Sequence, residues 1–192
     1  MSCCGTNNVR LARIDDAPAI AEVHVASWRT TYKGIFSDDL LDNLSVDKRA
    51  HSWRETLASP EPNSATLVAC NADGNVVGFI TGGAERTGRV GCEGELYAIY
   101  LLQFVQRRGL GRLLVQYFVR ELRARGFGSM AVWVLAANPS RRFYEALGGQ
   151  VVAEQQIERD GQSFTELAYG WQDLDTFKDT EGLSALLPIA RD

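Results

Sequence analysis

The stretch Gln106-Arg107-Arg108-Gly109-Leu110-Gly111-Arg112 decides the fold, because of what lies on either side of it. A largely apolar run over 95–102 precedes it and predicts a strand. After it, apolar residues recur at helical spacing over 110–125, and Gly126 supplies a stop. The glycines let the backbone approach a ligand closely, and the first amides of the new helix lack intrahelical acceptors. The stretch therefore predicts an anion-binding turn between a strand and a helix.

The composition of this turn favours a diphosphate as the ligand. Arg107, Arg108 and Arg112 supply charge-assisted donors, each worth about 1.5–3 kcal/mol when well aligned. The turn lacks the Gly-Lys-Ser/Thr of an ATP-type loop and the third glycine of a dinucleotide fingerprint. The alternative is a glycine-containing turn with solvated arginines, which the flanking strand and helix make less favourable.

Hydrophobic periodicity along the rest of the chain predicts an α+β domain built on one mixed sheet. A first helix should begin after Asp15 or Asp16 and end near Gly34. We expect one domain over 1–192, with a core over 9–171 and a C-terminal tail over 172–192. The other expected helices span 37–44, 46–57, 110–125 and 140–147, and the expected strands span 9–14, 65–70, 76–81, 95–102, 130–135, 150–157 and 164–171.

Composition narrows the class of protein. The chain has 192 residues, 45% of them apolar, and a net charge of −4, so no basic nucleic-acid-binding face is indicated. No signal peptide opens it and no apolar run reaches membrane-spanning length, which indicates a cytoplasmic protein without membrane contact. The four cysteines show no metal-ligand spacing, and neither His24 nor His51 has partners that would indicate a metal site.

With these elements in place, the turn resembles the acetyl-CoA pyrophosphate loop of the GNAT superfamily, whose pattern is Gln/Arg-x-x-Gly-x-Gly/Ala. Residues 95–147 also resemble that superfamily's preceding strand and its later Asn…Phe-Tyr-Glu…Gly helix. The resemblance implies a three-layer fold with a central, mixed, splayed sheet flanked by helices, and acetyl-CoA as cosubstrate. It also implies site residues: backbone groups of Ile99 and Leu101, with Asn138, would hold the pantetheine arm, and amides over 107–112, including Gly109, Leu110 and Gly111, the pyrophosphate.

The resemblance further implies how the acetyl group is transferred. Tyr144 occupies the position of a proton donor to the CoA thiolate. A phenol with a pKa near 10 is a weaker acid than a thiol near 8.5, so full transfer is uphill by about 2 kcal/mol and Tyr144 would act mostly by hydrogen bonding. Glu95, or its neighbour Glu93, is the candidate base, and would need a raised pKa or a water chain. The alternatives are an aromatic pair packing a short helix and a solvated charge at a strand end.

Trp28 and Tyr32 are candidates for the acceptor side of the site. They stand four residues apart on one helix face and could wall an amine through apolar and cation–π contacts, or serve as core aromatics. The leading hypothesis is direct transfer of acetyl to a primary amine of a small molecule in a ternary complex. Acetylation of a protein N-terminus or lysine and a non-catalytic acyl-CoA-binding regulator are the alternatives, and the sequence is also compatible with a homodimer.

Overall fold

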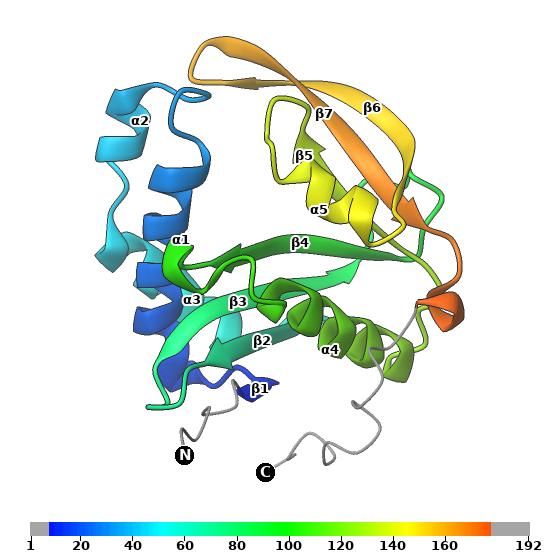
Figure 1. The fold of residues 1–192 in the computed structure, drawn as a ribbon, viewed down its shortest axis with the longest axis horizontal. Coiled ribbons are helices and arrows are strands. Elements are labelled where there is room, and N and C mark those ends of the chain that lie inside the picture. Colours follow the sequence, from blue (N-terminus) through cyan, green and yellow to red (C-terminus); the bar gives the residue numbers. More distant parts are fainter. Residues whose placement is uncertain (1–7, 178–192) are drawn as a thin grey trace.

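The computed structural model describes residues 8–177, which form one seven-stranded sheet with helices on both faces (Figure 1). The strand order is β1-β2-β3-β4-β5-β7-β6, which puts β4 in the middle. The strands are β1 (Asn8–Leu11), β2 (Ala65–Cys70), β3 (Val76–Ala84), β4 (Gly94–Leu101), β5 (Met130–Leu135), β6 (Gln150–Arg159) and β7 (Gln162–Trp171). The helices are α1 (Ala17–Thr31), α2 (Asp38–Asp42), α3 (Val46–Ala58), α4 (Leu110–Ala124) and α5 (Arg141–Ala146).

Local chemistry explains the first half of the sheet. The β2–β3 hairpin closes on Asn71, whose Oδ1 accepts from the amides of Asp73 and Asn75 at 3.1 and 2.9 Å. Gly74 adopts a φ of +85° within this turn, a conformation that costs glycine little. The neighbouring strands β1 to β4 pair antiparallel throughout. This half of the mixed sheet therefore follows from alternation and turn residues.

Helices cover the sheet on both faces, so the predicted three-layer arrangement is confirmed. On one face, α4 packs Leu114, Phe118 and Leu122, all with no exposed surface, against the strands. On the other, α1 and α3 pack an apolar cluster that includes Ile20 and Trp53. Figure 1 shows α4 apart from the α1–α3 group, with the strands between them. An amphipathic helix on each face buries both sides of the sheet.

The sheet splays at its centre, as predicted. Strands β4 and β5 are parallel neighbours, but they pair only at Gly94–Met130 and Glu95–Ala131. Beyond this point they diverge, and β4 keeps its pairing with β3 alone. The β3–β4 register shifts between Thr81 and Gly82, an irregularity of the kind that bends a strand. The divergence leaves one edge of β4 without a neighbouring strand.

Several expected features differ in detail. The first strand ends at Leu11, before the expected 14, because a 3₁₀ turn over Ile14–Asp16 follows it. Asp16 takes the N-cap position of α1 without capping, since its carboxylate instead accepts from Arg10 at 2.6 and 2.8 Å. The terminal hairpin is longer than expected, and β6 and β7 together reach across the molecule to α2 (Figure 1).

The expected C-terminal tail lies mostly outside the described residues. Its first part contains a 3₁₀ turn over Leu174–Thr176, with Leu174 fully buried, and residues 178–192 fall beyond what the structure describes. Over residues 8–177, no helix has both the length and the apolar character needed to cross a membrane.

Candidate active site

The turn between β4 and α4 has a backbone shaped for an anion. Arg107 and Gly109 both adopt positive φ angles, +58° and +84°, on either side of Arg108. Gly109 is the N-cap of α4 and has no side chain with which to cap its first amides. A left-handed φ at a non-glycine residue such as Arg107 is uncommon and concentrates at ligand sites. The turn therefore presents unpaired helix N-terminal amides to one side.

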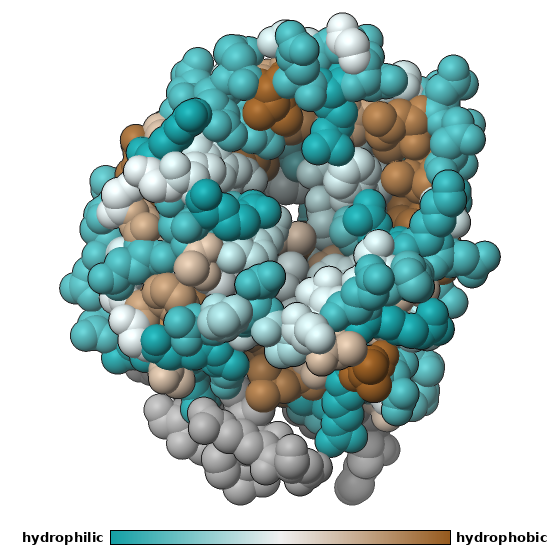
Figure 2. All heavy atoms as spheres, turned by 180° about the vertical axis from the view of Figure 1, so that it is seen from behind, coloured by the Kyte–Doolittle hydropathy of each residue, from teal (hydrophilic) through white to brown (hydrophobic). Residues whose placement is uncertain are grey.

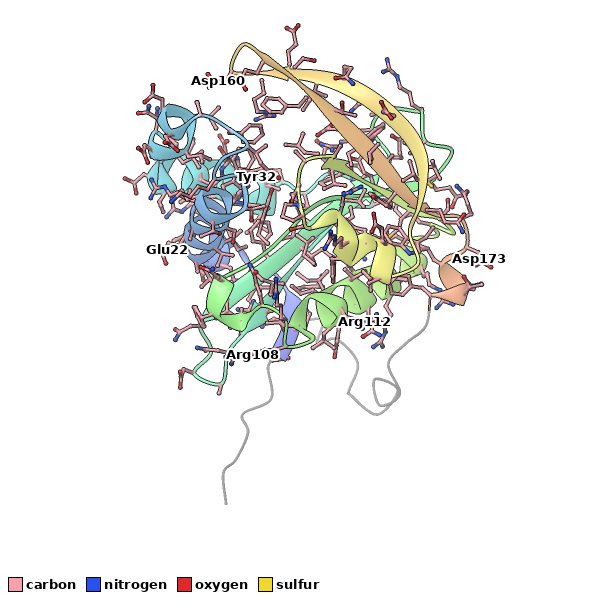
Figure 3. All side chains as sticks on the ribbon, turned by 45° about the horizontal axis from the view of Figure 1, so that its top comes forward. Glu22, Tyr32, Arg108, Arg112, Asp160 and Asp173 are labelled. Carbon is pink, nitrogen blue, oxygen red and sulfur yellow. The ribbon has the colours of Figure 1, made fainter. Side chains whose placement is uncertain are left out.

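The side chains of the turn divide into two groups. Arg107 and Arg112 line a cleft that begins here, and Arg112 also donates to the Ala146 carbonyl at 3.3 Å. Arg108 is exposed and lies outside the cleft lining, whereas Leu110 is 3% exposed and belongs to the core. Arg142 of α5 also lines the cleft, a residue that the sequence analysis missed. Figure 3 shows Arg108 and Arg112 at the same end of the molecule, beside α4.

The cleft has a volume of about 1240 Å³ and runs from this turn, past the splayed strands, to the end of α1 and the β6–β7 hairpin. Figure 2 shows the molecule hollowed near the centre of its back face. The cleft lining includes two arginines of the turn, Arg107 and Arg112, and aromatic side chains at the end of α1. Such a passage, charged at one end and largely aromatic at the other, suits two ligands that meet in the middle.

The free edge of β4 lines the middle of the cleft. The Leu102 amide donates to the Val77 carbonyl of β3 at 2.9 Å. Because backbone N–H and C=O groups alternate between the two edges of a strand, those of Ile99 and Leu101 point to the opposite edge of β4. At this level of the sheet β5 no longer pairs with β4, so this edge faces the cleft. The Leu101 carbonyl accepts from Gln106 Nε2 at 2.8 Å and from Ser27 Oγ at 3.2 Å, which fixes the strand end to the turn.

Tyr144 and Asn138 lie on the other wall of the cleft, 7% and 4% exposed. Burial raises the pKa of Tyr144 well above its ordinary value, with a further contribution from Tyr32. The Tyr144 hydroxyl therefore stays protonated and can donate a hydrogen bond. Asn138 Oδ1 accepts from the Ser140 amide at 2.8 Å, which organises the turn before α5.

Glu95 is buried rather than solvated, with 1% exposed surface, and it lines the cleft where β4 and β5 separate. Its carboxylate accepts from the backbone and the Nε of Arg86, both at 3.1 Å, and forms an ion pair with the same guanidinium. Arg86 also stacks on Tyr97 at 4.1 Å. Glu93 lies elsewhere, accepting from the Gly128 amide at 2.5 Å, and is not part of the cleft lining. The geometry thus favours Glu95 over Glu93 as the base.

Trp28 and Tyr32 lie together at the far end of the cleft, with ring centroids 4.9 Å apart, and Phe36 stacks on Tyr32. The Tyr32 hydroxyl lies 3.2 Å from that of Tyr100, on β4. Burial raises the pKa of both phenols, so both hydroxyls are neutral at physiological pH. Figure 3 shows Tyr32 in the space between α1 and the strands. Trp28 and Tyr32 pack against other aromatic rings and also line the cleft, so a role in the core and a role in the wall of the acceptor site are compatible.

The turn fits a CoA diphosphate on steric grounds as well. A Cβ added at Gly111 would lie 3.3 Å from Leu101 and 3.4 Å from Phe143, so the helix start, β4 and α5 already meet closely there. The absent side chain leaves the amides of the first turn accessible. Acetyl-CoA would supply the activated acetyl group, and Arg107, Arg112 and Arg142, which all line the cleft, could supply positive charge to its diphosphate.

Comparison with known proteins agrees with this geometry. Residues 84–157 match the family described as FR47-like protein. The uncharacterized N-acetyltransferase YuaI of Bacillus subtilis (strain 168) is 41% identical over 170 residues, which cover 88% of this chain and 95% of the relative.

Two solved structures share the fold. One is the PaiA N-acetyltransferase of Thermoplasma acidophilum in complex with coenzyme A, with a TM-score of 0.64, 21% identity, and coverage of 84% of this chain and 98% of that one. The other is YncA of Salmonella typhimurium with acetyl-CoA, with a TM-score of 0.65, 22% identity, and coverage of 92% and 99%. The chain therefore belongs to the GNAT superfamily of N-acetyltransferases and is an acetyl-CoA-dependent acyltransferase.

Proposed function

We propose that this enzyme acetylates the primary amine of a small molecule, by direct attack of the amine on acetyl-CoA within a ternary complex. The observation that carries the proposal is the roof over the acceptor end of the cleft. The tip of the β6–β7 hairpin meets the segment between α1 and α2, where Ser37 donates a hydrogen bond to the Asp160 carboxylate. Phe36 and Phe164 pack edge to face beneath it at 5.2 Å. Figure 3 labels Asp160 at this crossing.

A roof of this kind favours compact acceptors. The side chain of a folded protein would have to enter beneath the hairpin, whereas a free amine can diffuse in from the side. The hydrogen bond and the aromatic contact resist lifting of the hairpin, because lifting would expose apolar rings. Folded proteins are therefore the less favoured class of acceptor.

The proposed chemistry assigns one task to each residue. Backbone amides over 107–112 and the arginines hold the diphosphate, and Ile99 on the free edge of β4 orients the pantetheine and polarises the thioester carbonyl. The amine nitrogen forms a bond to the carbonyl carbon, and the carbon–sulfur bond then breaks. Tyr144 donates a hydrogen bond to the departing sulfur, and its raised pKa favours this over complete proton transfer.

Glu95 would take the proton that the ammonium loses. Arg86 occupies both of its carboxylate oxygens, so a water molecule between amine and carboxylate is the simplest route. Two protons leave the nitrogen as the ammonium becomes an amide: the first passes through Glu95 to solvent, and the second, released after the attack, ends on the CoA thiolate. Arg86 serves here as a positioning residue, because it touches Glu95 and holds its orientation.

A thiol-release assay over monoamines, polyamines, aminoglycosides and peptides tests the proposal. We expect turnover with at least one class of small amine and little with protein acceptors. Turnover confined to folded proteins or to peptide N-termini would refute the choice of acceptor. A chain that binds acetyl-CoA yet releases no thiol with any acceptor would refute the assignment of the catalytic residues.

A further inference from the structure

The acceptor end of the cleft carries two charged side chains that the mechanism above does not use, Arg159 and Glu166. The other charged lining residues are already assigned: Arg86 and Glu95 pair with each other, and Arg107, Arg112 and Arg142 are the candidates for contact with the diphosphate. Within residues 8–177, neither Arg159 nor Glu166 takes part in an ion pair. One positive and one negative charge thus remain available to an acceptor.

The hairpin fixes the order of these charges. Gln155 and Glu166 lie opposite each other across β6 and β7, and Gln155 Nε2 donates to Glu166 Oε2 at 2.9 Å. The next residue on the same face of β6 is Ile157, opposite Phe164 and also lining the cleft, and the one after it is Arg159. Four residues of strand separate the Cα atoms of Gln155 and Arg159 by about 13 Å. A carboxylate, an apolar stretch and a guanidinium therefore follow one another along one face.

The carboxylate end is the one nearer to the reaction centre. Glu166 lies opposite Leu135 of β5, the strand whose divergence from β4 opens the cleft, whereas Arg159 belongs to the last pair of β6 and β7 before the hairpin tip. The guanidinium end lies beneath the hairpin tip, where Arg159 rests over the rings of Trp28 and Phe36, 5.7 and 5.9 Å from their centroids. An amine held by Glu166 would thus lie on the side of the splayed strands, with the rest of the acceptor extending toward Arg159.

Resting on the proposed function, we infer that the acceptor is an ω-amino carboxylate: a primary amine and a carboxylate separated by a flexible apolar chain. Glu166 accepts a hydrogen bond from the amine and positions it, and Ile157 contacts the methylene groups. Arg159 binds the carboxylate, with a planar guanidinium that the two rings already orient. A diamine would bring a second cation to Arg159 and be repelled, and a plain alkylamine would leave the guanidinium without a partner.

The test compares acceptors that differ only at the far end: an ω-amino carboxylate of five or six carbons, its primary amide, and the diamine of equal length. We expect kcat/KM for the carboxylate to exceed that for the amide by about ten- to a hundredfold, the range of a charge-assisted pair. Arg159→Gln should abolish this preference by lowering kcat/KM for the carboxylate to about that for the amide. Arg159→Glu should favour the diamine. Arg54→Gln, an exposed arginine of α3 outside the cleft lining, is the matched control.

A binding readout separates this inference from the proposed function. In the presence of CoA, the amino carboxylate should raise the melting temperature of the wild type and of Arg54→Gln, but not that of Arg159→Gln. If this pattern appears without turnover, the acceptor class stands and the catalytic assignment falls. Equal use of carboxylate and amide by the wild type, an equal loss for all acceptors in Arg159→Gln, or the absence of any carboxylate-dependent stabilisation would overturn the inference.

Discussion

Replacing Gly111 by aspartate should strongly weaken acetyl-CoA binding while leaving the fold intact. Gly111 is the second residue of α4, so its side chain would enter the space next to the first-turn amides. A carboxylate about 5 Å from a phosphate charge costs about 3 kcal/mol at an effective dielectric constant near 20. The dissociation constant should therefore rise by about two hundredfold. The free protein should not suffer from the charge, because acidic residues stabilise helix N-termini.

Asparagine at position 111 is the matched control, since it has the same size without the charge. Both side chains would press on Leu101 and Phe143 at about the same distance, 3.3 to 3.4 Å from the Cβ. At a hundredfold excess of acetyl-CoA over the wild-type dissociation constant, the wild type should gain about 2.7 kcal/mol. The Asp variant should gain only about 0.2 kcal/mol under the same conditions.

Thermal denaturation with and without acetyl-CoA measures both quantities. For a domain of this length, the wild-type gain corresponds to a rise of about 5–10 °C in melting temperature. The Asn variant should keep a substantial part of that rise, and the Asp variant should lose nearly all of it. An Asp variant that responds to acetyl-CoA like the wild type would refute the loop as the diphosphate site. Equal loss in both variants would attribute the effect to crowding rather than to charge.

Three further substitutions test the catalytic groups and the core. Tyr144→Phe should lower kcat about ten- to a thousandfold with little change in acetyl-CoA affinity, and full activity in steady-state thiol release would remove the hydroxyl from the mechanism. Glu95→Gln should lower the rate at neutral pH by a similar factor. In a pH–rate profile this deficit should shrink as pH approaches the pKa of the amine, because less of the amine then needs a base. A deficit that stays constant with pH would point to a structural role. His24 is buried among aromatic rings, and this burial lowers its pKa to about 3. The unfolded chain, with a histidine pKa of about 6.5, therefore takes up the proton first as pH falls. The free energy of unfolding should decrease from about pH 6.5 down to about pH 3. Between pH 7 and pH 5 the loss should be about 2 kcal/mol by chemical denaturation, and His24→Gln should flatten this slope.

The local rules of the sequence predicted most elements of the fold. The bounds of β2 and β5 agree with the expected ranges, because both are short, largely apolar runs that end close to turn-forming residues. The first strand was predicted too long, since a hydrogen-bonded ion pair between Arg10 and Asp16 stabilises a 3₁₀ turn that no periodicity reveals. The splay was expected from the family resemblance alone, because no local pattern says where two parallel strands stop pairing.

Of the candidate site, too, only a part could be predicted from the sequence. The phosphate turn could be found from the sequence, because its glycines, its arginines and the helix start are contiguous and act through their own backbone. Arg142 offered a weak signal, as a basic residue at the start of the helix that carries Tyr144. Arg86 offered none, because it faces Glu95 only through the pairing of the adjacent strands β3 and β4, nine residues away along the chain.

The sequence by itself determined the fold class, through its periodicity, and the kind of cosubstrate, through a short motif. It also predicted Tyr144 as the residue proposed to face the cosubstrate. Only the tertiary structure decided that Glu95 is buried and paired with Arg86, that Glu93 lies outside the cleft, and that the hairpin tip meets the segment between α1 and α2. It also brought Arg159 and Glu166 onto the same face as Ile157 and above the aromatic rings of α1. The physical reason is that an acceptor site is made by side chains from distant segments, and their distances depend on how the whole sheet twists, splays and packs.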